Sequence, residues 1–125
     1  MNLVDTEDDS VNFEFQFFQS LYEKLPNDKR LISILAELYT CHGEIEKGLK
    51  LDRKLVEADK TNSTAHYNLA CSLSLVENFE EAICALRKSI SLGYSDFNWM
   101  LEDQDLKALR TTEYFTQLKR DLGFL

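Results

Sequence analysis

The chain has 125 residues, of which 44% are hydrophobic and 29% are charged, and its net charge is -8 at pH 7. This size suits one domain with a modest core. The acidic balance argues against nucleic acid and anionic membrane surfaces as partners, and no apolar run approaches the roughly 18 residues that a transmembrane helix needs.

The first eleven residues hold four acids and few apolar side chains. Such a composition predicts a mobile acidic tail over residues 1–11, and it resembles neither a secretory signal nor a membrane anchor. The three cysteines, Cys41, Cys71 and Cys84, are an odd number without a recognisable spacing. We therefore expect free thiols and a cytoplasmic protein.

A strongly aromatic segment follows over residues 12–26. Its alternating phenylalanines would suit a strand, but the rest of the chain offers no strand to pair with, and a second pattern favours a helix. That pattern places apolar residues four apart, at Phe13, Phe17, Leu21 and Leu25.

This helix would be apolar on more than one face, and each apolar face must be buried. Phe13 and Phe15 have no evident neighbour in the chain. We predict that they contact another protein or a second copy of this chain in a homodimer, or that residues 1–10 cover them. The residues expected to pack on the following helices are Phe17, Phe18, Leu21, Tyr22 and Leu25.

Residues 63–96 predict a helix, a short turn and a second helix, because apolar and small residues recur at three-and-four spacing on both sides of the turn. Asn78 and Glu81 predict a capping box at the start of the second helix, and Gly93 suits the positive φ that often ends a helix. Ala70 and Ala82 supply the small side chains that two antiparallel helices need where they cross.

The same layout occurs 34 residues earlier, without a gap, over residues 29–62. We expect helices there at about 29–42 and 45–58, with Asn27 or Asp28 as the first cap. Gly48 stands where Ala82 stands in the later hairpin. A period of about 34 residues with this layout is typical of tetratricopeptide repeats.

After Gly93 the repeat pattern ends, and residues 97–125 predict three short helices. The suitable caps for them are Ser95 or Asp96, Asp103, and Thr111 or Thr112. Stacked repeats leave an apolar face at each end of the array, so we expect this segment to cover the last hairpin.

The chain thus resembles the tetratricopeptide family, most specifically through the segments 67–70 (YNLA) and 79–83 (FEEAI). Residues 97–125 are similar to the end segment of bacterial tetratricopeptide arrays, with Trp99 and Phe115 among the matching positions. The resemblance implies one all-α domain over residues 12–125, with antiparallel helical hairpins stacked as a short right-handed α-solenoid. Its parts are a half repeat (12–26), two repeats (29–62 and 63–96) and a C-terminal capping segment (97–125).

The resemblance also implies a concave groove lined by the first helix of each repeat. Asn68 suits the family's clamp for a peptide carboxylate, but Ser33 and Glu37 occupy positions where that clamp needs a base and an amide. An extended peptide or a helix of another protein is therefore the expected ligand. The side chains expected to face the groove are Arg30, Ser33, Glu37, Thr40, Cys41, Thr64, Tyr67, Asn68, Cys71 and Ser74.

These features predict a protein-interaction scaffold that binds its partner in the groove or through the aromatic helix. One alternative is a small acidic tetratricopeptide chaperone that shields a client protein, and another is a thiol or metal enzyme. The enzyme is the weaker hypothesis, because His66 and Cys71 are poorly spaced to share a metal and the chain has no phosphate-binding loop or local nucleophile motif. We therefore expect no cofactor, metal or catalytic residue.

Overall fold

The computed structural model of the protein describes residues 3–124, and their side chains from residue 12 onward. Every regular element within residues 3–124 is a helix. The elements in chain order are α1 (Leu3–Lys24), α2 (Lys29–Cys41), α3 (Ile45–Ala58), α4 (Ser63–Leu75), α5 (Phe79–Ser91), α6 (Phe97–Glu102), the short 3-10 helix η1 (Gln104–Leu106), α7 (Lys107–Arg110) and α8 (Glu113–Asp121).

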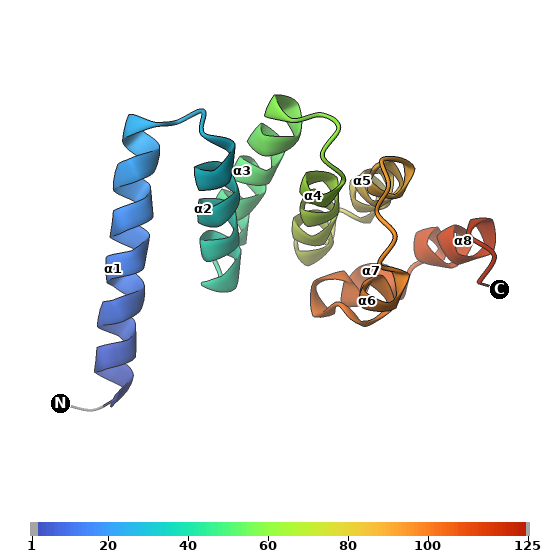
Figure 1. Ribbon diagram of the computed structural model, residues 1–125. Coiled ribbons are helices and arrows are strands. Elements are labelled where there is room, and N and C mark those ends of the chain that lie inside the picture. The colour runs from blue at the N-terminus through green and yellow to red at the C-terminus, as the bar shows by residue number, and fades with distance from the viewer. Residues whose placement is uncertain (1–2, 125) are drawn as a thin grey trace.

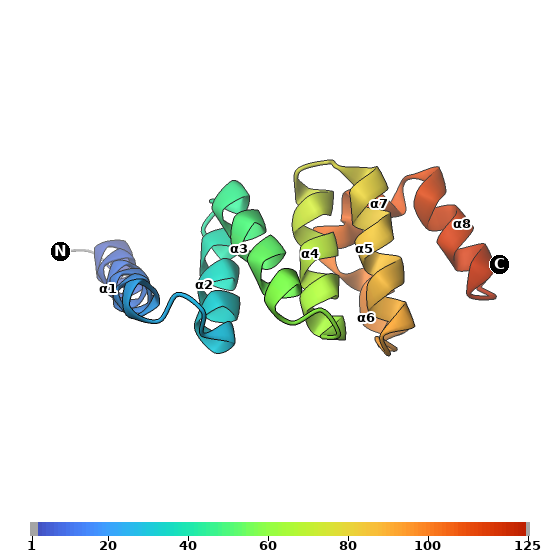
Figure 2. The same cartoon turned by 90° about the horizontal axis from the view of Figure 1, so that it is seen from above.

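The helices form stacked antiparallel hairpins, as the sequence predicts. α2 pairs with α3 and α4 with α5, and α3 packs on α4 to join the hairpins (Figures 1 and 2). α1 packs on α2 at one end, while η1 and α7 contact α4 and α8 contacts α5 at the other. The predicted α-solenoid with a C-terminal capping segment is confirmed.

Capping side chains mark the start of α2 and α4, and a glycine with positive φ follows the end of α5. Asp28 accepts a hydrogen bond from the backbone N–H of Leu31 at 3.0 Å, and Asn62 accepts one from Ala65 at 3.1 Å. Both bonds satisfy backbone donors that a helix N-terminus leaves free. Gly93 follows the end of α5 with a φ of 113°, as predicted.

The predicted capping box at α5 is wrong. Asn78 occupies the N-cap position, but its side chain makes no capping hydrogen bond. The Glu81 carboxylate instead lies 2.5 Å from the Arg53 guanidinium on α3. An ion pair between neighbouring hairpins therefore replaces the local contact.

Small residues occupy the helix crossings, as predicted. Ala70 and Ala82 have no exposed surface, and Gly48 is buried at the crossing of α2 and α3. A Cβ atom at Gly48 would lie 3.0 Å from the Ala36 carbonyl oxygen and collide with the Thr40 hydroxyl. The two helices can approach this closely only because position 48 has no side chain.

Helix α1 begins at Leu3 rather than near residue 12. No Gly or Pro separates the acidic segment from the aromatic one, and acids near a helix N-terminus are favoured by the helix dipole. The helix can therefore continue through the segment predicted as a tail. Residues 1 and 2 of that tail lie outside the described residues, and its mobility stays a prediction.

The C-terminal segment covers the last hairpin. Asp96 caps α6, Asp103 caps η1 and Thr112 caps α8, each through its side-chain oxygen, as predicted. Its apolar residues complete the core next to α4 and α5. The buried ones are Met100, Leu106, Leu109, Phe115 and Leu118.

Helices long and apolar enough to cross a membrane are absent from the part of the chain that the structure describes.

The closeness of the α2–α3 crossing gives a direct test. Replacing Gly48 with Ala should lower the free energy of unfolding by about 1 to 2 kcal/mol, because overpacking outweighs the roughly 1 kcal/mol that Ala gains over Gly in a helix. Urea unfolding would measure the change. Thr40→Ala in the same chain removes one of the colliding atoms and should recover part of the loss, whereas a Gly48→Ala protein more stable than the wild type would contradict this packing.

Candidate functional site

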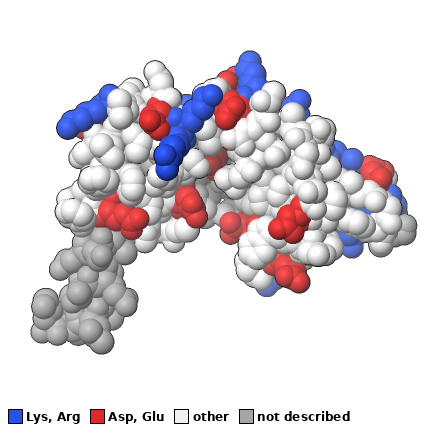
Figure 3. Space-filling view, in the orientation of Figure 1, with Lys and Arg blue, Asp and Glu red and all other residues white. Residues whose placement is uncertain are grey.

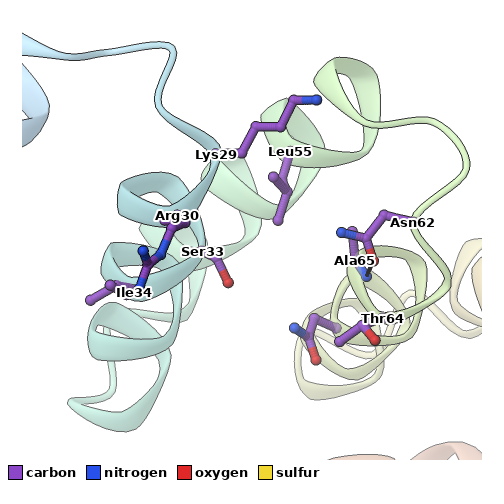
Figure 4. A pocket seen from close by; sticks show the side chains of 9 residues that line it. Lys29, Arg30, Ser33, Ile34, Leu55, Asn62, Thr64 and Ala65 are labelled. Carbon is purple, nitrogen blue, oxygen red and sulfur yellow. Dashed lines mark hydrogen bonds between the residues drawn. The ribbon is translucent and has the colours of Figure 1, made fainter.

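The side chains of α2 and α4 border a hollow of about 360 Å³ near the N-terminal ends of both helices (Figure 4). Leu55 of α3 forms part of its wall, and its charged groups are Lys29 and Arg30. The other lining residues are Ser33, Ile34, Asn62, Thr64, Ala65 and Asn68. We call this the basic hollow.

A second hollow of about 290 Å³ lies further along the same helices, and its walls include residues of the C-terminal segment. Its charged side chains are all acidic. Ser33 and Asn68 line both hollows, so the two adjoin along the same face of α2 and α4, and we call them together the groove. The second is called the acidic hollow, and it is lined by Ser33, Ala36, Glu37, Thr40, Cys41, Asp52, Tyr67, Asn68, Cys71, Ser72, Trp99, Asp103 and Asp105.

The structure brings together nearly all the residues predicted to face the groove. Arg30, Glu37 and Asn68 are exposed on its walls. Tyr67 and Cys71 border the acidic hollow but are 5% and 7% exposed. They can therefore offer a ligand only a small contact area.

Ser74 does not reach the groove. Its side chain is fully buried, and its hydroxyl oxygen accepts a hydrogen bond from the backbone N–H of Leu109 at 3.3 Å. The C-terminal segment covers this end of α4, which the repeat pattern alone does not predict. The prediction that Ser74 faces a partner is therefore wrong.

Tyr67 anchors the C-terminal segment to α4. Its hydroxyl donates a 2.7 Å hydrogen bond to the Asp103 carboxylate, and its ring stacks on Tyr94 with centroids 4.3 Å apart. Burial and the neighbouring carboxylate raise the pKa of the Tyr67 hydroxyl, so it stays a hydrogen-bond donor. Tyr67 thereby fixes the wall that Asp103 contributes to the acidic hollow.

Asp103 is the centre of this junction. One carboxylate oxygen accepts from Tyr67 and lies 3.7 Å from the Cys71 sulfur, and the other accepts from the Asp105 backbone N–H at 3.0 Å. The Asp103 carbonyl oxygen accepts from the Arg110 guanidinium at 2.7 Å. These bonds hold η1 and α7 against α4.

Cys71, Asp103 and Asp105 place one potential metal-ligand atom each within 4.8 Å of one another. Burial and nearby carboxylates raise the pKa of the Cys71 thiol, so the thiolate that metals bind is disfavoured. Both Asp103 oxygens already accept hydrogen bonds. The cluster is therefore suited to a hydrogen-bonded junction rather than to a metal site.

Asp52 is a carboxylate on α3 that is only 6% exposed and borders the acidic hollow. Its Oδ2 accepts a 2.5 Å hydrogen bond from the Ser72 hydroxyl. Within residues 12–124, no donor is hydrogen-bonded to its Oδ1. Burial raises the pKa of Asp52 to about 6, although the Ser72 bond opposes this shift.

The repeat pattern misses the four charged or aromatic contributors to the acidic hollow from outside the first helices of the repeats: Asp52, Trp99, Asp103 and Asp105. Asp52 lies in an apolar stripe between Leu51 and Leu55, and a lone carboxylate in such a stripe is a usable sequence signal. The other three belong to the C-terminal segment. Their placement beside α2 follows from tertiary packing alone.

The aromatic face of α1 differs in part from the prediction. Phe15 packs on Tyr39 and His42, with ring centroids 5.3 and 5.0 Å apart. Phe13 and Phe17 are instead the exposed pair, at 72% and 51%. Phe13 is therefore exposed, and its contact with a partner stays a prediction. The predictions for Phe15 and Phe17 are wrong, because the rotation of α1 on α2 sets which stripe is buried.

The prediction that Leu25 packs is also wrong, since Leu25 is 52% exposed, whereas Phe18, Leu21 and Tyr22 are partly buried. Lys54 donates to the Tyr22 hydroxyl at 2.8 Å and so ties α1 to α3.

The three cysteines are free, as predicted, and Cys41 and Cys84 are exposed.

Comparison with known proteins supports the architecture. No protein-family model matches the chain. The chain is 29% identical over 83 residues to a chloroplastic protein of Arabidopsis thaliana. The match covers 64% of this chain and 25% of the relative. The chain thus spans about a quarter of the length of this curated relative.

The fold is also similar to the crystal structure of MamA. The two superpose with a TM-score of 0.63 at 21% sequence identity, over 96% of this chain and 76% of MamA. At this level of identity the likeness shows that the two chains share a fold of stacked helical hairpins.

The buried carboxylate of Asp52 predicts a pH-dependent stability. Its pKa of about 6 in the folded protein exceeds the ordinary value of 3.8, so the folded state binds the proton more tightly and stability falls as the pH rises from 4 to above 6. Asp52→Asn removes this penalty and keeps an acceptor for Ser72. It should stabilise the protein by up to about 3 kcal/mol at pH 7.5 and have little effect near pH 4.

Urea unfolding across this pH range would measure the difference. Glu46→Gln, which removes an exposed carboxylate from the same helix, is the matched control and should show little change. An Asp52→Asn protein less stable than the wild type at pH 7.5 would contradict the assignment.

Proposed function

We propose that this chain is a tetratricopeptide-type repeat domain that acts as a protein-interaction scaffold and holds an extended segment of a partner protein in the groove. The observation that carries the proposal is the pair of adjoining hollows between α2 and α4, which share Ser33 and Asn68. The 34-residue period of the sequence supports the family assignment.

The walls of the groove suit peptide recognition. They belong to helices held by buried apolar contacts, so little ordering accompanies binding. Ser33 and Asn68 stand where the hollows meet and offer hydrogen-bonding side chains to a peptide backbone. Arg30 and Glu37 add exposed charges on the same face of α2.

A non-enzymatic role fits the chemistry of the groove. Burial and the neighbouring carboxylates raise the pKa of the Cys71 thiol and so disfavour the nucleophilic thiolate. Histidine does not line the acidic hollow. A thiol or metal enzyme is therefore the weaker alternative.

The exposed pair Phe13 and Phe17 provides a second candidate surface, and we propose a second copy of this chain as its occupant. The two rings lie four residues apart on one exposed stripe of α1, and apolar side chains grouped in this way mark an interaction surface. A small acidic chaperone that shields a client protein would use the same rings on a different protein.

The homodimer is tested by sedimentation of a Phe13→Glu, Phe17→Glu variant. We expect a dimeric wild type and a monomeric variant, because a buried charge in this face would be unpaired. Leu25→Glu is the matched control, since Leu25 is also exposed but lies at the C-terminal end of the helix. A monomeric wild type would remove the dimer and leave the chaperone alternative.

The groove is tested by filling it. Asn68→Trp places a large ring where both hollows meet, whereas Lys50→Trp adds the same ring to an exposed position on α3 outside the groove. Proteins cross-linked to the wild type in its native host would be compared between the two variants after circular dichroism confirms that both fold. We expect Asn68→Trp to reduce capture of the partner at least about tenfold, the effect of losing roughly 1.4 kcal/mol, and Lys50→Trp to retain it. Equal capture by both variants would refute the groove as the binding site.

A further inference from the structure

The two halves of the groove carry opposite charge. Lys29 and Arg30 are the charged residues of the basic hollow, and no carboxylate lines it. The acidic hollow has no Lys or Arg among its lining residues. Acidic side chains lie on both sides of the central depression on this face of the molecule (Figure 3). The carboxylates that line the acidic hollow come from three parts of the fold, namely Glu37 of α2, Asp52 of α3, and Asp103 and Asp105 of the C-terminal segment.

Asp52 gives the acidic hollow an open acceptor. Only 6% of the residue is exposed, yet its side chain borders the hollow. Ser72 occupies Oδ2, and no described donor is hydrogen-bonded to Oδ1. Oδ1 is not enclosed by the surrounding protein, so a cation that enters the hollow can donate a strong, charge-assisted hydrogen bond to it.

Trp99 favours a particular cation. Its side chain is 51% exposed and lines the same hollow as Asp52 and Glu37. A guanidinium can stack on an indole and donate to carboxylates in its own plane, which an ammonium does less well. The chemistry of this end of the groove therefore suits arginine.

Helix geometry sets the distance between the two charge sites. On α2 the basic hollow is lined by residues centred between Arg30 and Ser33, and the acidic hollow by residues centred near Glu37. Six residues along a helix span roughly 9 Å at 1.5 Å per residue. An extended peptide covers this distance in about three residues.

We propose that the groove recognises a partner segment with an acidic side chain and an arginine about three residues apart, the acid in the basic hollow and the arginine in the acidic hollow. This inference rests on the proposed function and adds its charge specificity. The groove therefore differs from one that binds a carboxylate along its whole length, because the acidic hollow repels carboxylates.

The probe for this inference is the peptide acetyl-Ala-Glu-Ala-Ala-Arg-Ala-amide. Trp99 is the sole tryptophan of the chain, so its fluorescence reports directly on the acidic hollow. We expect the probe to change this fluorescence and to bind at least about tenfold more tightly than an analogue with Gln in place of both charged residues. Calorimetric titration gives the two dissociation constants. Equal affinities, or no response to the probe at millimolar concentration, would overturn the inference.

Substitutions at the charged residues test which side chain of the peptide lies in which hollow. Arg30→Glu should weaken binding of the probe about tenfold, and a peptide with Lys in place of Glu should recover it on that variant alone. Asp52→Asn should weaken binding of the arginine probe by a similar factor, whereas Glu46→Gln, outside the groove, should not. Failure of the Lys peptide to recover binding would contradict the placement of the acidic side chain beside Arg30.

The two proposals fail in different ways. If the charged probe and its neutral analogue bind alike while Asn68→Trp still abolishes partner capture, the charge specificity is wrong and the scaffold function stands. If Asn68→Trp leaves partner capture unchanged, the groove function itself is wrong.

Discussion

The hydrogen bond from the Tyr67 hydroxyl to the Asp103 carboxylate is the contact on which the groove depends. It spans 36 residues of sequence and joins the second hairpin to the segment that follows it. Without the C-terminal segment, the face of α2 and α4 would lack Trp99, Asp103 and Asp105. The same segment covers the apolar end of the stack, so it contributes both to the stability of the array and to the shape of the groove.

Much of the fold could be predicted from sequence because hairpin geometry is local. Helical spacing and the small residues at the crossings recur with the 34-residue period, and the cap at Asp28 acts on a residue only three positions away. The two ends of the array were harder to predict from the sequence. The aromatic helix starts at Leu3, and the choice between Phe15 and Phe17 as the buried residue depends on how α1 rotates against Tyr39 and His42.

The groove was predictable only in its repeated part. Periodicity places Arg30, Glu37 and Asn68 on one face, and the structure brings them to one groove. It cannot place Trp99 or Asp103, which belong to no repeat, and it wrongly exposes Ser74, which α7 covers. Asp52 carried a signal of its own, because a carboxylate in an apolar stripe lowers stability when ionised and such groups are often kept for function.

From these contacts we expect the hairpins and the C-terminal segment to unfold as one cooperative unit. Native-state hydrogen exchange tests this most directly, because it measures the opening free energy of each helix separately. We predict that amides of α4 and of residues 100–110 open together in the wild type, and that Tyr67→Phe lowers protection in residues 100–110 more than in α2. Residues 100–110 exchanging freely while α4 stays protected would contradict a groove built from both.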